Sequence, residues 1–323
     1  MNRPRLWLMA CLFAGCGLSG CAVTPYRYGQ FHSDQSNEAS PAEVVFEYGR
    51  PHQGLDRLAW VVGIPSRILP MHPNVNNHSL SKETTEKLNT YLQDNDLTDV
   101  LVRVNQYDPS GEWRRLTQNS RVAPGWRYSF GVLTLTAYTL VPGRVFGGDI
   151  YNPFTNSLYI NSDVPAVVMV EAAYAKDIHS RRLPGTYAAI NEFPVLTLWR
   201  HTHAVNDVLG YALIHDDWEV ERETYRVVYP QMGVHAALGG HTAASLGTAM
   251  PFITLPVMAV GGALAGHAVG QTTIAQREAG RKSESDSAAT DGSRRGAEND
   301  AGGIELTGFA EIDDDSPRSR RED

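Results

Sequence analysis

The feature that most constrains this chain is a strand-to-helix transition between Asn156 and Asp177, NSLYINSDVPAVVMVEAAYAKD. Leu158 to Ile160 form a short β-prone run bounded by Asn and Ser. Asp163 stands where an N-cap residue belongs, and Pro165 fits the first helical turn, where a proline is tolerated. The sequence therefore predicts a strand, a tight turn and a helix that carries Glu171 among apolar neighbours.

Two residues on this predicted helix, Val170 and Tyr174, flank Glu171 at the histidine positions of the zinc-hydrolase motif His-Glu-x-x-His. GGDIYNPFTNSLYINSDVPAVVMVEAAYAKD resembles a little-characterised family of bacterial lipoproteins, whose members carry His-Glu-x-x-His-Ala-Lys-Asp after the same strand and Asp-x-Pro-Ala turn. The likeness covers residues 46–270, and its most specific parts are WVVGIPS, NQYDPSGEWRRL, GWRYSFG, YNPFTNSLYINSDVPA and ETYRVVYP.

That family is similar at longer range to the gluzincin metallopeptidases, whose third metal ligand is a Glu on a following helix. The resemblance implies an α+β fold with a zincin-like core, in which a strand is followed by the motif helix and by further helices. It also places a Glu-x-x-Ala-x-x-Asp element on His201, Ala204 and Asp207, so that His201 stands at the third ligand position.

The implied metal site is degenerate in this chain. A catalytic zinc needs about three protein ligands with lone pairs and an open position for water. Val170 has no lone pair, and Tyr174 is a phenol, which ligates zinc rarely. Glu171 is then a remnant of the motif, a general base without a metal-bound water to activate. We therefore expect no metal and no other cofactor, and zinc only if His201 or another histidine completes an atypical site.

No other catalytic motif compensates for these changes, because the chain lacks Gly-x-Ser-x-Gly, a phosphate-binding glycine loop and a free cysteine nucleophile. The first interpretation is a non-catalytic, metallopeptidase-like lipoprotein, a pseudoenzyme with a structural or binding role and an unknown protein partner. A membrane-anchored hydrolase that uses Glu171 with His201 is the second. The third is a membrane-associated assembly module.

The N-terminus has the layout of a secretory signal peptide, residues 1–20. Arg3 and Arg5 precede an apolar run from Leu6 to Leu18, which is too short to span a bilayer. It ends in Leu-Ser-Gly-Cys21, which resembles the bacterial lipobox, whose cysteine is diacylated with chains such as palmitate. Phe-Ala-Gly-Cys16 is a weaker competing site. The sequence therefore predicts lipidation at Cys21.

All cysteines, Cys11, Cys16 and Cys21, lie in this first segment, so a processed chain keeps only the lipidated one and can form no disulfide or thiolate metal site. Each buried acyl methylene contributes about 0.8 kcal/mol, so two chains give a durable membrane anchor. We expect the bacterial cell envelope, and Ala22 after the cysteine resembles lipoproteins sent to the outer membrane. Residues 21–41 read as a lipidated tether that reaches roughly 25 Å.

The predicted zincin-like domain covers residues 42–230. Its first strand is VVFEYG; Ser81 caps a helix, and Val100 to Val104 form the next strand. Residues 126–141 are apolar, with helix and strand both open. Helices are expected at 193–213 and at 218–229, the latter stopped by Pro230.

An arginine- and tryptophan-rich patch, GEWRRLTQNSRVAPGW, lies between Pro109 and Trp126. Arginine and tryptophan are also typical of nucleic-acid-binding surfaces, so this function is an alternative to a merely solvated segment. The chain carries a formal net charge of −8, however, and an exported protein rarely meets nucleic acid, so we expect no nucleic-acid partner. The expected structure is a solvated hairpin whose arginines pair with nearby carboxylates.

Residues 231–275 are predicted to form an apolar, Gly-rich helical segment. From Val227 to Gln276 the chain has 50 residues without Asp, Glu, Lys or Arg. Gly262, Gly266 and Gly270 stand four apart, as in a small-xxx-small packing face. Residues 251–270 are long enough to insert into a membrane, and a helix pair docked on the domain is the alternative.

Residues 276–323 turn to Ser, Gly, Asp, Glu and Arg, with 8 basic and 13 acidic side chains and almost no large apolar ones. Such a segment buries too little surface to offset its ordering entropy, so a disordered tail is predicted.

Overall fold

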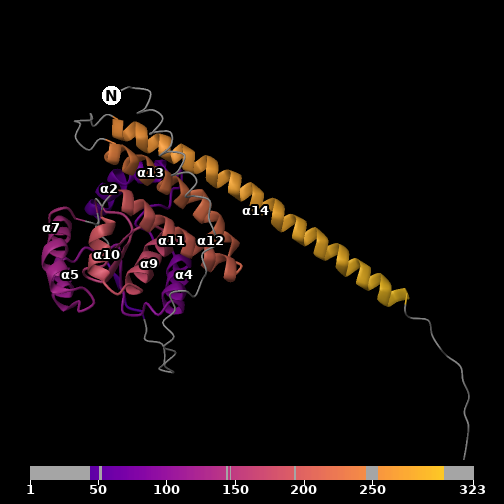
Figure 1. Ribbon diagram of the computed structural model, residues 1–323, viewed down its shortest axis with the longest axis horizontal. Coiled ribbons are helices and arrows are strands. Elements are labelled where there is room, and N and C mark those ends of the chain that lie inside the picture. The colour runs from indigo at the N-terminus through magenta and orange to yellow at the C-terminus, as the bar shows by residue number, and fades with distance from the viewer. Residues whose placement is uncertain are drawn as a thin grey trace, which may run out of the picture. The chain divides into compact units, whose positions relative to one another are not determined.

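A computed structural model describes residues 44–50, 53–142, 145, 147–192, 194–244 and 254–301 (Figure 1). The chain divides into two compact units, Met1–Ile274 and Ala275–Asp323. The predicted signal peptide, Cys21 and the tether lie outside the described residues.

The first half of the chain supplies most of the sheet and a group of short helices. Its elements are β1 (Phe46–Tyr48), α2 (Gln53–Val62), α3 (Ile64–Ile68), α4 (Lys82–Asp94), β2 (Leu101–Val104), α5 (Pro109–Gln118), α6 (Pro124–Trp126), the π-helix η1 (Arg127–Gly131), α7 (Val132–Leu140), β3 (Ile150–Asn152) and β4 (Ser157–Ile160).

Every regular element that the structure describes in the second half is a helix. It contains α9 (Pro165–His179), α10 (Pro184–Asn191), α11 (Pro194–Ile214), α12 (Trp218–Glu223), the π-helix η2 (Thr224–Val228), α13 (Tyr229–Ala244) and α14 (Thr254–Ala301). The protein is therefore mixed α+β, with a small sheet in a mainly helical chain.

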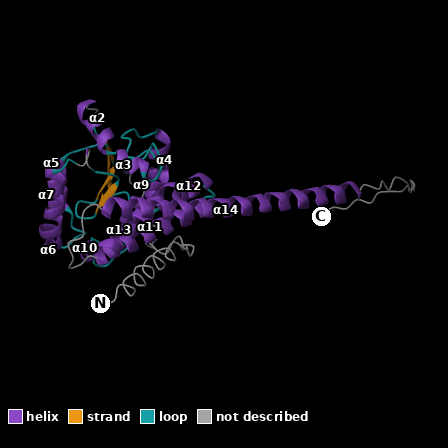
Figure 2. Ribbon diagram, turned by 90° about the horizontal axis from the view of Figure 1, so that it is seen from above, coloured by secondary structure: helices purple, strands orange, loops and turns teal. Residues whose placement is uncertain are grey.

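The four strands lie in the order β1-β2-β4-β3. β1, β2 and β4 are parallel, with Val102 paired to Phe46 on one side and Leu158 on the other, and β3 is antiparallel to β4. Figure 2 shows the sheet between α5 to α7 on one side and α9 on the other. Every residue of β2 and β4 is buried, as expected for strands with both faces covered.

Helix α9 is the centre of the first unit, and residues Pro165 to Ile178 are all buried. It packs chiefly against α11. A buried ion pair joins the two helices, because Lys176 Nζ donates to Asp207 Oδ1 at 2.6 Å. The strand and the helix predicted between Asn156 and Asp177 are therefore confirmed as β4 and α9, which four residues connect.

The cap assigned to Asp163 is wrong, because Val164 is the N-cap residue of α9 and provides no side-chain hydrogen bond. Asp163 instead accepts hydrogen bonds at the start of α4, from Ser81 N at 2.9 Å and Thr84 Oγ1 at 2.6 Å. Its carboxylate thus stabilises the N-terminus of a distant helix, and Ser81 caps α4 as predicted.

Two further predictions are corrected by the helices. The expected hairpin after Pro109 is helix α5, which begins at the strong start signal Asp108-Pro109, with Asp108 accepting from Gly111 N.

Pro230 does not stop a helix, because it lies inside α13 directly after the π-helix η2. The wider π turn accommodates the proline ring and its missing N–H. Residues 126–140, left open between helix and strand, are helical.

The glycine face of α14 is a packing face, as predicted. A Cβ added at Gly262, Gly266 or Gly270 would lie far inside van der Waals contact with the carbonyl oxygens of Gly233, Tyr229 or Tyr225, respectively. Of the helices that the structure describes, none is both long and apolar enough to cross a membrane.

The composition of residues 276–323 predicts disorder, but α14 continues as a helix through Ala301. Its side chains from Ala275 to Ser287 are mostly exposed, so this part of the helix is solvated all round. Residues 302–323 lie outside the described part of the chain.

Candidate functional site

Glu171 lies in the middle of α9, where the resemblance places the catalytic carboxylate. Its side chain is 8% exposed, and its Oε2 accepts a hydrogen bond from Tyr151 N of β3 at 3.1 Å. Burial raises the pKa of Glu171, whereas the positive charge of Arg200 and the Tyr151 N–H oppose that rise. The carboxylate is therefore fixed and desolvated, as a general base would be.

Arg200 of α11 supplies the positive charge beside Glu171. Its guanidinium carbon lies 4.3 Å from the centroid of the Tyr174 ring, in a cation–π contact, and the residue is 9% exposed. Although burial disfavours the charged form, Glu171, Tyr174 and Glu192 raise the pKa of Arg200. Glu171 and Tyr174 thus lie about one turn apart on α9, and the buried cation of α11 packs on the Tyr174 ring.

The other two residues from the sequence prediction are Val170 and His201. Val170 is buried in the same hydrophobic core as Tyr174, one turn earlier on α9. His201 stacks on His235 of α13 with 4.2 Å between ring centroids and 22° between planes. Burial, His235 and Arg200 all lower the pKa of His201, so its imidazole is neutral at pH 7. Arg200, rather than His201, is the α11 residue that contacts the Tyr174 ring.

Within the described ranges, no three or more His, Cys, Asp and Glu residues are grouped so that they could hold a metal ion. Glu171 has a guanidinium nearby in place of imidazole ligands. A cation 4.3 Å from the ring of Tyr174, at the second ligand position, repels a divalent metal, so the present arrangement fits zinc poorly.

Sequence reasoning missed Arg200, although a signal was present. Arg200, Ala204, Asp207 and Tyr211 are all buried and recur at helical spacing on α11. A charged residue in phase with a buried helix face needs a partner, and Asp207 and Arg200 find theirs on α9.

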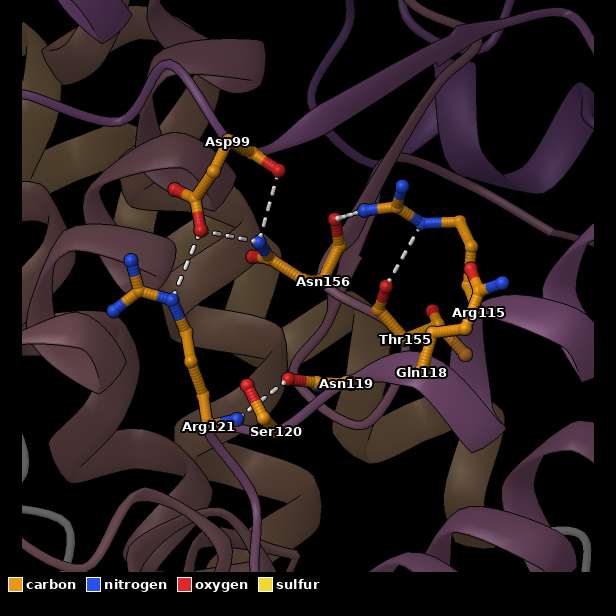
Figure 3. Close-up of a pocket in the computed structure, with 8 residues that line it drawn as sticks. All are labelled: Asp99, Arg115, Gln118, Asn119, Ser120, Arg121, Thr155 and Asn156. Carbon is orange, nitrogen blue, oxygen red and sulfur yellow. Dashed lines mark hydrogen bonds and ion pairs between the residues drawn. The ribbon is translucent and has the colours of Figure 1, made fainter.

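A second polar site lies at the amino ends of β2 and β4, whereas the segment that leads into α9 follows the carboxyl end of β4. Asp99 precedes β2 and Asn156 precedes β4, so both stand at the amino ends of parallel strands. Asn156 has a positive φ of 54°, which an Asn tolerates better than most residues. Together with the end of α5 these segments enclose a pocket of about 200 Å³, lined by Asp99, Arg115, Gln118, Asn119, Ser120, Arg121, Thr155 and Asn156 (Figure 3).

Hydrogen bonds fix the frame of this pocket. Arg121 Nε donates to Asp99 Oδ2 at 2.9 Å, and Asn156 Nδ2 donates to the same oxygen at 3.1 Å. Arg115 Nη2 donates to Asn156 O at 2.7 Å, and its Nε donates to Thr155 O at 2.9 Å. Figure 3 shows the two guanidinium groups on either side of Asn156.

His179, the last residue of α9, lies behind the pocket. Its Nε2 lies 3.0 Å from Asn156 Oδ1 and 3.3 Å from Tyr151 Oη. Burial lowers the pKa of His179 to about 4, with Asp99 opposing the shift, so the ring is neutral near pH 7. Neutral His179 therefore acts as a hydrogen-bonding support for Asn156.

Comparisons of the chain with protein-family models, with curated proteins and with solved structures found no match.

Proposed function

We propose that this chain is a non-catalytic, metallopeptidase-like lipoprotein of the bacterial cell envelope, with a structural or binding role on a zincin-like core. The carrying observation is the buried guanidinium of Arg200, which lies over the ring of Tyr174 and whose positive charge opposes the rise that burial causes in the pKa of Glu171. In a metallopeptidase the cation at this place is zinc. Here the chain itself supplies a fixed cation that has no exchangeable water.

The chemistry of Glu171 supports this proposal. A general base must lie within hydrogen-bond reach of a water that a metal or another group activates. The buried carboxylate is held by a backbone N–H, and the positive charge of Arg200 favours its ionised form, but a guanidinium offers no open coordination site. A β4 strand that leads directly into α9 supports the zincin-like part of the proposal.

The test is the zinc content of the purified protein after equilibration with equimolar zinc, together with peptide cleavage. We expect well below one zinc per chain and no cleavage. If the wild type holds one zinc per chain and loses it in Glu171→Gln or His201→Ala, the alternative proposal of an atypical hydrolase replaces this one.

Two triple variants make the test sharper. Val170→His with Tyr174→His places two imidazoles one turn apart beside Glu171. Because Arg200 contacts the Tyr174 ring, adding Arg200→Glu should complete a three-ligand site and yield about one zinc per chain. Adding His201→Glu instead retains the repelling guanidinium and should bind far less zinc. Val170→His alone is the control.

A second candidate function, a membrane-associated assembly module, rests on the exposed side of α14. Val257, Val260 and Leu264 are 70%, 50% and 55% exposed, within 50 residues that carry no formal charge. Their spacing places them along one side of the helix. Flotation of the lipid-free chain, residues 22–323, with phosphatidylcholine vesicles tests this role: wild type should float, and Val257→Ser with Leu264→Ser should not. A wild-type chain that stays in the soluble fraction contradicts it.

A further inference from the structure

The pocket beside Asn156 has unused hydrogen-bond donors on its wall. Arg121 Nε donates to Asp99, and Arg115 Nε and Nη2 donate to backbone carbonyls and to Ser157 Oγ. The remaining guanidinium N–H groups, the Gln118 amide and the Ser120 hydroxyl make no hydrogen bond within the described part of the chain. Donors thus outnumber the acceptors that remain available.

The charges of the pocket do not cancel. Asp99 is paired with Arg121 and also accepts from the Asn156 amide. Arg115 is half-buried, and its partners are neutral oxygens. The nearest carboxylate along its helix, Glu112, is bound instead to Arg103 at 2.6 Å. The lining therefore carries one positive charge without a carboxylate partner, in a concavity of about 200 Å³.

We propose that this pocket binds a carboxylate group of the kind found at the C-terminus of a peptide. A guanidinium presents parallel N–H donors that match the two oxygens of a carboxylate. A single uncompensated positive charge suits a monovalent anion, because a divalent phosphate would leave one negative charge unbalanced in the pocket. This inference does not depend on lipidation or on the metal chemistry at Glu171.

The ligand chemistry can be tested on the full-length protein by saturation-transfer difference NMR. The probes are N-acetylglycine, its neutral amide N-acetylglycinamide, and inorganic phosphate, all at matched ionic strength. We expect the acid to bind and the amide not to bind. Equal binding of acid and amide, or preferential binding of phosphate, would overturn the carboxylate assignment.

Three variants locate the site. Arg121→Gln removes a donor and leaves the Asp99 charge unpaired, so affinity for N-acetylglycine should fall about fivefold. Asp99→Asn removes the repelling charge and keeps an oxygen that can accept from Asn156, so affinity should rise about fivefold. Arg114→Gln removes an exposed arginine of α5 that does not line the pocket, and it should change nothing.

These variants avoid Arg115, whose three hydrogen bonds hold the segment from Thr155 to Ser157 in place. Arg121 and Asp99 are about half exposed, so their replacement should leave the fold intact, and a circular dichroism spectrum checks this. If Arg121→Gln and Arg114→Gln weaken binding equally, the anion is attracted by overall charge and the pocket assignment fails.

Discussion

Gly266 and Gly261 lie on the same helix and should respond in opposite ways to the same substitution. A Cβ at Gly266 would overlap the backbone of Tyr229 and Pro230, whereas a Cβ at Gly261 meets nothing within 4 Å. Replacing a helical glycine by alanine stabilises by about 1 kcal/mol through helix propensity alone. Gly261→Ala should show this gain undiminished.

Gly266→Ala receives the same propensity gain but must push two helices apart. The obstacle is a carbonyl oxygen, so no side-chain rotamer can relieve it. Overpacking of this kind costs about 1–3 kcal/mol. The unfolding free energies of the two variants should therefore differ by roughly 1–3 kcal/mol, with Gly266→Ala the less stable.

Urea unfolding followed by circular dichroism measures both values under the same conditions. The two variants should share one m-value, so that the difference in midpoint reports stability. If Gly266→Ala is as stable as Gly261→Ala, the close approach of α14 to η2 and α13 does not exist and the packing argument is refuted.

Three further predictions concern other parts of the chain. Cys21→Ser should leave unprocessed precursor, and an intact mass that shows cleavage elsewhere with a free N-terminus would contradict lipidation. Glu112→Gln leaves the buried Arg103 without its buried charge partner and should cost about 3–5 kcal/mol in urea unfolding, whereas Glu47→Gln, at the exposed partner of the same arginine, should cost under about 1 kcal/mol. Burial raises the pKa of Glu223 to about 7, so the folded state keeps a proton that the unfolded state releases above about pH 4.5. The free energy of unfolding should therefore fall as the pH rises from 5 to 7. Glu223→Gln should flatten this fall, and parallel pH profiles of the wild type and the variant would refute the prediction.

The parts of the fold that sequence predicted well are those determined by local chemistry. The buried strands β2 and β4 carry β-branched and apolar runs, Ser81 precedes a helical pattern, and the glycines of α14 repeat every four residues. Each signal lies within a few neighbouring residues, so no tertiary contact is needed to read it.

The errors arise where a partner lies far away in the sequence. Asp163 has the local context of an N-cap, but its hydrogen-bond donors are Ser81 and Thr84, some 80 positions earlier. The role of Arg200 depends on Tyr174 across a helix crossing. Likewise the pocket combines Asp99, Arg121 and Asn156 from three segments, and the arginine-rich patch alone predicts only a solvated surface.

The α9–α11 crossing explains how the proposed loss of zinc can leave the scaffold intact. A metal ligated from both helices would tie them together, and removing it would leave buried ligands unpaired. Here two contacts that need no metal join the same helices: Arg200 over Tyr174, and Lys176 with Asp207 at 2.6 Å. Tyr91 of α4 also donates to Asp207, so a third helix supports the ion pair. Because these links join α9 to α11 at Tyr174 and Lys176, the crossing that buries Glu171 needs no metal to hold it, and the burial of this carboxylate is not by itself evidence of catalysis.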